Sequence, residues 1–198
     1  MVRWEPGAPE RLQKAALELF ATRGFEQTTA TEIAQSVGLT ERTFFRHFSD
    51  KREVFFHGQE RLVDAFVEAV AAAPAGADPM EVVVFALQST APVFFSEERR
   101  PFSRMRQSVI EKNPALQERE HHKLGTLAEA MAGALRARGV DELTAALAAR
   151  SGITVFGLAF LQWIDEGESR SLAEIEDEML ARLRLLISPA ASRPAGRA

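Results

Sequence analysis

Basic residues gather in a short stretch of the chain, from residue 40 to residue 52. Four basic and two acidic residues lie in it: Arg42, Arg46, Lys51, Arg52, Glu41 and Asp50. The 198-residue chain as a whole has a net charge of −4, so the positive charge of this stretch is local. Nucleic-acid sites need such a local basic patch when the whole protein is not a polycation. The stretch is therefore a candidate contact surface for nucleic acid.

Three phenylalanines share the stretch, and a helical wheel separates them. With 100° per residue and Phe44 at 0°, Phe48 falls at about 40° and Phe45 at about 100°. Arg42 and Arg46 fall at about 160° and about 200° on the same wheel. Phe44 and Phe48 are therefore expected in a core, and Phe45 on the outward arc with the two arginines. A phenylalanine left in water forgoes roughly 1.5–3 kcal/mol of burial, which suggests that Phe45 contacts a partner.

The elements that position these residues are expected to be helices. Apolar residues recur at spacings of three and four along nearly the whole chain, which predicts an all-α fold. A first helix is expected over residues 9–23, before Gly24. A capping box formed by Thr29 and Glu32 begins a second helix, which ends at Gly38. A third helix then spans residues 41–48.

A longer helix followed by two short helices around a glycine turn is the helix-turn-helix arrangement. Its second short helix usually enters the major groove of DNA. A further capping pattern, Asp50-x-x-Glu53, predicts a fourth helix that runs to about Ala73. Five more helices are expected near residues 80–95, 101–112, 114–138, 141–166 and 171–187. Pro92 lies inside the first of these and should kink it.

We expect three segments along the chain: a helix-turn-helix domain over residues 1–56, a helical domain over 57–187, and a disordered tail over 188–198. No stretch has the length of a signal peptide, and the longest nearly uncharged run, 151–164, is shorter than the ~20 residues of a membrane span. The chain has no cysteine, which fits a reducing compartment. These features predict a cytoplasmic protein without a membrane partner.

Residues 11–55 resemble the N-terminal domain of TetR-family transcriptional regulators. The matching positions are Arg11-Leu12-x-x-Ala15-Ala16-x-x-Leu19-Phe20, Gly24-Phe25, Thr28-Thr29, Glu32-Ile33-Ala34, Gly38-Leu39-Thr40, Thr43-Phe44-Phe45-x-x-Phe48 and Lys51. The rest of the chain matches that family in length and helical character only. The resemblance implies a C-terminal domain for ligand binding and dimerisation.

The resemblance also implies roles at DNA for residues at matching positions. Arg42 and Arg46 would read bases, most naturally guanine, and Glu41 could accept from a cytosine amino group. Family members commonly carry tyrosine at the position of Phe45, and the tyrosine hydroxyl bonds to the DNA backbone. Phenylalanine has no hydroxyl and cannot make this hydrogen bond. Phosphate contacts would come from Thr29, Thr40, Thr43, His47 and Lys51.

Aromatic residues of the second half are candidates for the wall of a ligand pocket, although an aromatic stripe in a helical protein is more often core. They are Phe85, Phe94, Phe95, Phe102, Met105, Phe156, Phe160 and Trp163. A small molecule bound there would be mostly apolar. A basic cluster beside them suits a solvated helix start, or else the contact of an anionic ligand or a relay to the DNA-binding domain: Arg99, Arg100, Arg104 and Arg106.

The last two helices are candidates for a dimer interface, because two copies of such a pair would form a four-helix bundle. The expected interface residues are Ala148, Gly152, Val155, Ala159, Met179, Leu183 and Leu186. The alternative is that both helices complete the core of one subunit.

Glu118, Glu120, His121 and His122 favour a solvated face over a metal site, since adjacent histidines point to different faces and no cysteine is present. No set of residues has a catalytic pattern, and no cofactor is expected. The sequence therefore predicts a homodimeric regulator, a repressor that binds a palindromic DNA operator and is released by a small molecule. The alternative is an all-helical small-molecule-binding protein or enzyme with a relict helix-turn-helix.

Overall fold

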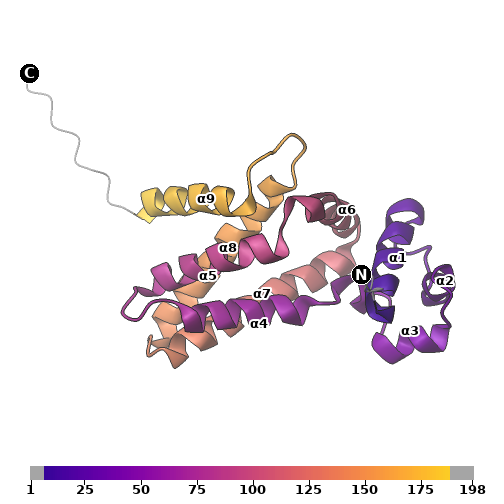
Figure 1. Cartoon of the computed structure of the whole chain (residues 1–198), viewed down its shortest axis with the longest axis horizontal. Helices are drawn as coiled ribbons and strands as arrows, with labels where there is room; N and C mark the ends of the chain where they lie inside the picture. Colours follow the sequence, from indigo (N-terminus) through magenta and orange to yellow (C-terminus); the bar gives the residue numbers. More distant parts are fainter. Residues whose placement is uncertain (1–6, 188–198) are drawn as a thin grey trace, which may run out of the picture.

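The computed structural model describes residues 7–187, and in this range its regular elements are all helices. Three helices form one end of the molecule (Figure 1): α1 (Ala8–Arg23), α2 (Ala30–Ser36) and α3 (Glu41–His47). The remaining elements are η1 (Glu53–Phe56), α4 (Gln59–Ala72), α5 (Pro79–Phe94), η2 (Glu97–Arg99), α6 (Arg100–Glu111), α7 (Pro114–Ala137), α8 (Glu142–Trp163) and α9 (Leu172–Ile187). The expected all-α fold is confirmed. The tail expected to be disordered, 188–198, lies outside the described residues.

Local signals set the two short helices. The Thr29 hydroxyl accepts from the Glu32 backbone N–H, and the Glu32 side chain accepts from the Thr29 backbone, so the expected capping box is present. The Thr40 hydroxyl accepts from the backbone N–H of Thr43 at 3.2 Å and caps α3. Gly38 turns the chain between the two helices at φ 71°, in the left-handed region that favours glycine.

The fourth helix expected from Asp50 is wrong in its first part. Asp50 does accept from the backbone N–H of Glu53 at 3.1 Å, but only the single turn η1 follows. The chain then breaks at Gly58, where φ is 81°, and α4 begins at Gln59. The reason lies in three consecutive buried residues, Val54, Phe55 and Phe56. Neighbouring side chains of a continuous α-helix point in different directions, so a short turn and a break suit their joint burial.

The hydrophobic core has two clusters. One holds the inner faces of α1, α2, α3 and η1 together with Val109 and Ile110 of α6 and Leu116 of α7. The other holds residues of α4, α5, α7, α8 and α9. Helix α6 therefore contributes to the core of the three-helix end although it lies far from it in sequence.

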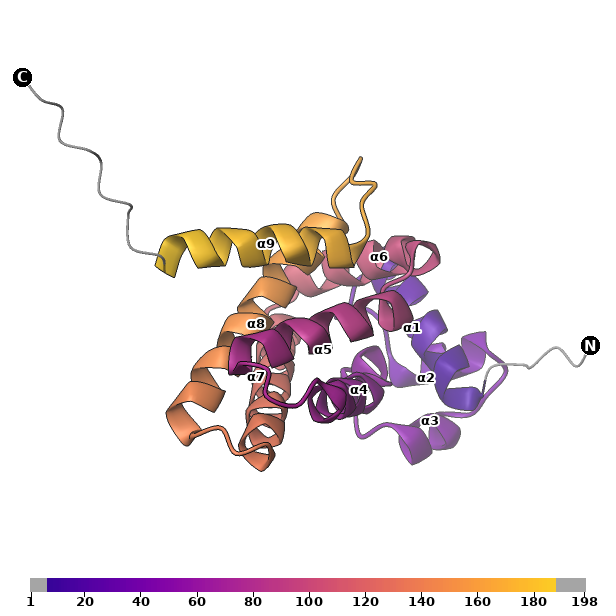
Figure 2. The same ribbon diagram turned by 60° about the vertical axis from the view of Figure 1, so that its left-hand side comes forward.

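Helix α8 packs against α5, α7 and α9, and α9 crosses over the C-terminal part of α8 (Figure 2). The small-residue face of α8, with Ala148, Gly152, Val155 and Ala159, is buried within the chain. A Cβ atom at Gly152 would overlap Cγ1 of Val83 in α5. These four residues were expected at a dimer interface, and the structure corrects their placement, because close packing of α5 already occupies that face.

The opposite face of α8 is apolar and exposed. Its leucines are Leu143, Leu147, Leu158 and Leu161, which are 76%, 70%, 54% and 44% exposed. Of the expected residues on α9, Met179 and Leu183 are partly buried and Leu186 is 82% exposed. By length and hydropathy α8 would also fit a membrane span, as would α5 and α6 taken together, but the burial of one α8 face equally fits a core helix.

Candidate nucleic-acid interface and ligand cavity

The outward side of α3 carries the residues that the sequence analysis placed there. Phe44 is fully buried and Phe48 is 6% exposed, whereas Phe45 is 50% exposed. The wheel is therefore confirmed for all three phenylalanines. The ring of Phe45 packs edge-on against Phe44, with centroids 5.3 Å apart. Glu41, Arg42, Arg46 and His47 are exposed on the same helix.

The cations of α3 are held only loosely. Nη2 of Arg46 lies 3.4 Å from Nε2 of His47. Within residues 7–187, the guanidinium group of Arg42 has neither a hydrogen bond nor an ion pair. An unpaired guanidinium on an exposed helix face can form a bidentate pair with a guanine edge without first breaking a contact inside the protein.

The donors of Thr29 are already engaged. Its backbone N–H and its hydroxyl both donate to Oε2 of Glu32, at 2.8 and 2.9 Å. These hydrogen bonds, the backbone one first, lower the pKa of the Glu32 carboxyl. Arg23 lies 3.4 Å from the same carboxylate. A DNA phosphate at this helix end would have to take the Thr29 donors from Glu32.

Lys51 points toward the turn that precedes α2. Its ammonium donates to the carbonyl of Phe25 at 2.8 Å, and the carbonyl of Thr28 lies 3.4 Å away. The same ammonium lies 4.2 Å from the centroid of the Phe25 ring, and the Lys51 side chain is 26% exposed. Lys51 therefore holds the loop that presents Thr29, a role that the sequence analysis did not foresee.

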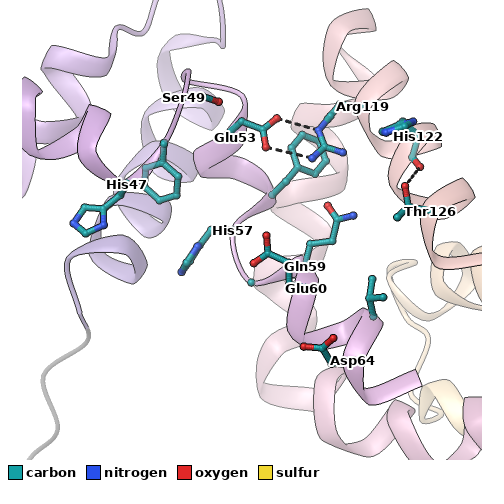
Figure 3. A pocket seen from close by; sticks show the side chains of 14 residues that line it. His47, Ser49, Glu53, His57, Gln59, Glu60, Asp64, Arg119, His122 and Thr126 are labelled. Atoms are coloured by element: carbon teal, nitrogen blue, oxygen red, sulfur yellow. Dashed lines mark hydrogen bonds and ion pairs between the residues drawn. The ribbon is translucent and has the colours of Figure 1, made fainter. Parts of the chain in front are cut away.

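A cleft of about 670 Å³ separates the end of α3 from α4 and α7 (Figure 3). Glu53 of η1 lies at one edge of the cleft, and its carboxylate accepts two hydrogen bonds from Arg119 of α7, at 3.0 and 3.2 Å. His47, His57 and His122 also line the cleft. Among residues 7–187, no group of three His, Cys, Asp or Glu side chains is placed to hold a metal ion.

A second cavity, of about 210 Å³, lies between the three-helix end and the aromatic residues of the C-terminal helices. Five of the expected pocket residues line it: Phe94, Phe95, Phe102, Phe156 and Phe160. The other three do not line it. Phe85 and Met105 are 37% and 40% exposed on outward faces, and Trp163 is fully buried behind Phe95 and Phe160.

A third cavity, of about 350 Å³, lies next to the second. The two have Phe156, Phe160 and Glu120 as common lining residues, and the third adds apolar side chains such as Ile110 and Leu124. Known ligand sites have volumes of roughly 300–1,000 Å³. Together these neighbouring cavities provide the space of such a site, whereas the second cavity alone is small.

The solvated face expected for Glu120 is wrong, because this residue belongs to a group of charged residues that line the second cavity. The sequence analysis missed this group. Glu120 accepts from Arg106 at 2.7 Å, and its other oxygen lies 3.5 Å from the Lys123 ammonium. All three side chains are less than one-fifth exposed. Burial lowers the pKa of Lys123 to about 8. The spacing of Glu120 and Lys123 on one helix was a visible signal, but Arg106 joins them only through tertiary packing.

The remaining arginines of the basic cluster have different surroundings. Arg100 is 6% exposed, pairs with Glu97 at 2.6 Å and donates to carbonyls of the α8–α9 loop. Arg104 donates to the carbonyl of Ile164 at 2.6 Å. Arg99 is exposed and lies at the mouth of the second cavity. The solvated helix start expected for these residues is thus wrong for Arg100, which instead connects α6 to the loop between α8 and α9.

Comparisons with known proteins agree with this architecture. Residues 12–57 match the family model of bacterial regulatory proteins of the TetR family. The HTH-type transcriptional regulator TcmR of Streptomyces glaucescens is 40% identical over 74 residues, which are 37% of this chain and 33% of TcmR. The match to this curated relative therefore spans about a third of its length.

Solved structures are similar over nearly the whole chain. FadR of Thermus thermophilus, a TetR-family transcriptional repressor in complex with lauroyl-CoA, has a TM-score of 0.54 and 28% identity over 95% of this chain and 100% of its own. SmeT, the repressor of a multidrug efflux pump of Stenotrophomonas maltophilia, has a TM-score of 0.60 at 18% identity, over 96% of this chain and 95% of its own, and supports the fold. The N-terminal helix-turn-helix is therefore of TetR type, and the whole chain is similar in fold to TetR-family transcriptional regulators.

Proposed function

We propose that the protein is a homodimeric repressor that binds a palindromic operator and is released from it by a small molecule. The observation that carries this proposal is the outward face of α3, where Arg42, Phe45 and Arg46 stand on a helix-turn-helix of TetR type. Such a helix reads base edges in the major groove, and two copies related by a two-fold axis read two half-sites. A regulator of this kind acts on the chromosome, so we place it in the cytoplasm.

The test is to sequence the DNA that the purified protein retains from random fragments. We expect a palindrome whose half-sites are about one helical turn or a multiple of it apart. Arg42→Ala and Arg46→Ala should each relax the preference at particular bases, at a cost of ~1–3 kcal/mol. Retention of DNA without any selected sequence would contradict the proposal and favour the alternative of a binding protein or enzyme with a relict helix-turn-helix.

We assign dimerisation to the exposed leucine face of α8 rather than to its buried small-residue face. Leu143, Leu147, Leu158 and Leu161 recur at helical spacing on that face, and Leu185 and Leu186 of α9 are 77% and 82% exposed. An apolar stripe of this kind marks a contact surface on a soluble protein. A second copy that packs its own α8 and α9 there would bury these leucines in a four-helix bundle.

Light scattering at micromolar concentration tests this interface. The wild-type protein should have the mass of a dimer, and Leu147→Glu should have that of a monomer because a buried unpaired carboxylate is costly. Ala72→Glu, on the exposed end of α4, is the control and should stay dimeric. A monomeric wild type, or a Leu147→Glu variant that remains a dimer, would contradict the assignment.

For the effector, we propose a mostly apolar molecule in the two neighbouring cavities around Phe156 and Phe160. Support comes from their aromatic lining and from the lauroyl-CoA bound by Thermus thermophilus FadR. An effector can release the operator only by binding the DNA-incompetent state more tightly. Lauroyl-CoA is therefore the first probe, and Ser103→Trp, which fills the second cavity, should blunt release while sparing operator binding. If lauroyl-CoA releases the operator equally from the wild type and from Ser103→Trp, the effector binds outside the second cavity.

A further inference from the structure

The charged group at the second cavity has an excess of positive charge. Arg106 of α6 and Lys123 of α7 share a single carboxylate, that of Glu120, at 2.7 and 3.5 Å. Their side chains are only 14% and 15% exposed. Arg99 adds a third cation to the lining, and Glu120 is the only acid among the described residues that line this cavity. The wall of the cavity therefore combines cationic and aromatic side chains.

A buried cation without its own counter-ion is unfavourable. Burial lowers the pKa of Lys123 to about 8, so the ammonium is still mostly charged at neutral pH. Taking a charge out of water costs several kcal/mol unless a partner and hydrogen bonds compensate it. One carboxylate can compensate one of the two cations. A ligand that brings an anionic group to this place would compensate the other.

We propose that the effector is an amphipathic acid whose anionic oxygen group binds Arg106 and Lys123 while its apolar body lies against Phe156 and Phe160. This inference rests on the proposed ligand-responsive function and specifies its ligand class. Carboxylate and phosphate share the required chemistry, since both accept charge-assisted hydrogen bonds from arginine and lysine. The apolar body would continue into the third cavity past Phe160, which is only partly buried.

Arg106 also links this site to the DNA-binding end of the molecule. Its guanidinium carbon lies 5.2 Å from the ring centroids of both Phe55 and Phe56 in η1. Those two rings belong to the core that α1, α2 and α3 share. An anion that draws Arg106 toward the cavity weakens this cation–π contact. The charge of the ligand is thus transmitted through Arg106, whereas Lys123 contributes to affinity.

Calorimetric titration of the full chain without DNA tests the ligand class. The probes are dodecanoate, dodecyl phosphate and lauroyl-CoA, with dodecanol as the neutral molecule of equal chain length. We expect at least one of the two dodecyl anions to bind about tenfold or more tightly than dodecanol, the size of a charge-assisted hydrogen bond. The order of dodecanoate and dodecyl phosphate identifies the preferred head group, and lauroyl-CoA shows whether a large phosphate-bearing head is accepted.

Three variants locate the site. Lys123→Met should reduce the preference for anion over alcohol to near onefold and leave the affinity for dodecanol unchanged, and Lys123→Arg should retain the preference. Lys112→Met, an exposed lysine at the end of α6, is the matched control and should behave as wild type. Equal binding of anions and dodecanol to the wild type, no binding of any anionic probe, or a preference that survives in Lys123→Met would each overturn the inference.

Operator release separates this inference from the proposed function. Arg106→Met should bind the preferred anion severalfold more weakly and, when saturated with it, release less operator than the wild type does. Full release from saturated Arg106→Met would overturn the coupling through this residue. A protein that prefers anions but selects no operator would support the ligand class and contradict the proposed function. A protein that selects an operator but does not prefer anions would support the proposed function and contradict the ligand class.

Discussion

The three-helix end and helix α8 differ in what determines which residues face inward. In the three-helix end the decisive contacts are local: Thr29 with Glu32, Thr40 with Thr43, and the left-handed glycine at 38. Helix α8 has apolar residues on two opposite faces, and the sequence of the helix itself does not say which one packs inside. The choice is made by α5, whose Val83 approaches Gly152 closely. Local order can be inferred from neighbours in sequence, whereas such a choice needs the partner helix.

This difference has a functional side. The face of α3 that remains exposed carries arginines beside Phe45, as expected for a surface that meets DNA. The face of α8 that remains exposed carries leucines, as expected for a surface that meets another protein. In both helices the residues that point outward, rather than those in the core, distinguish the two proposed interfaces.

Replacing phenylalanines of α3 is expected to give the largest effect. Phe44→Ala opens a cavity in the core of the three-helix end and should destabilise the protein by ~3–5 kcal/mol. Phe45→Ala removes a ring that is half exposed and should leave the melting temperature nearly unchanged while weakening operator binding severalfold. Thermal unfolding and operator titration of both variants check this contrast. An equally early melting of Phe45→Ala would mean that its ring supports the core.

A buried acid of α9 gives the next effect. Glu176 is 1% exposed, neither of its carboxylate oxygens has a hydrogen-bond partner among the described residues, and burial raises its pKa to about 8. The unfolded chain releases this proton near pH 4.5, so stability is lost as the pH rises from about 4.5 to about 8. Glu176→Gln should remove this loss and stabilise the protein above pH 8, on the order of 2–4 kcal/mol.

Urea unfolding at pH 5 and pH 8.5 measures the pH effect. The difference between the two pH values should be smaller in Glu176→Gln than in the wild type. Glu68→Gln, an exposed residue of α4, is the control and should keep the difference of the wild type. If the wild type and Glu176→Gln lose the same stability between the two pH values, Glu176 has a partner in solution.

The errors of the sequence analysis follow the same division between local and tertiary determinants. The caps and turns, and the buried faces of α1, α2 and α3, could be predicted because their causes lie within a few residues along the chain. The fourth helix was placed too early, because the joint burial of Val54, Phe55 and Phe56 depends on α6 and α7. The aromatic residues of the cavity were partly found by composition. The burial of Glu120 with Arg106 could not be found, since the two residues meet only when α6 packs on α7.

Two glycines of α8 allow a local effect, helix propensity, to be compared with a tertiary one, packing against α5, within one helix. Gly152→Ala places a Cβ against the buried Val83 and should destabilise the protein by about 1–3 kcal/mol, as overpacking does. Gly157→Ala meets no atom within 4 Å and should stabilise it by about 0.5–1 kcal/mol through helix propensity. Denaturant midpoints of both variants should therefore move in opposite directions. A shift of both in the same direction would mean that α5 does not lie so close to Gly152.

The last comparison concerns Lys51, for which two roles at DNA can be distinguished. A direct phosphate contact would lower the slope of log affinity against log salt by about one when the charge is removed. The structure instead shows the ammonium on the carbonyl of Phe25 and over the Phe25 ring, where it holds the loop before Thr29. Under the proposed function, a lysine in this position would act on DNA through the placement of Thr29. Its own charge is then largely satisfied inside the protein.

We therefore expect Lys51→Ala to lower stability by about 1 kcal/mol, as for a lost hydrogen bond, and to weaken binding to all DNA sequences alike. The salt slope should stay within half a unit of the wild-type value, because the counterions released on binding are the same. Arg46→Ala is the comparison: it should leave the melting temperature unchanged, since Arg46 is exposed, and alter base preference. A slope reduced by about one unit in Lys51→Ala, at unchanged melting temperature, would show instead that the ammonium leaves Phe25 and contacts a phosphate in the complex.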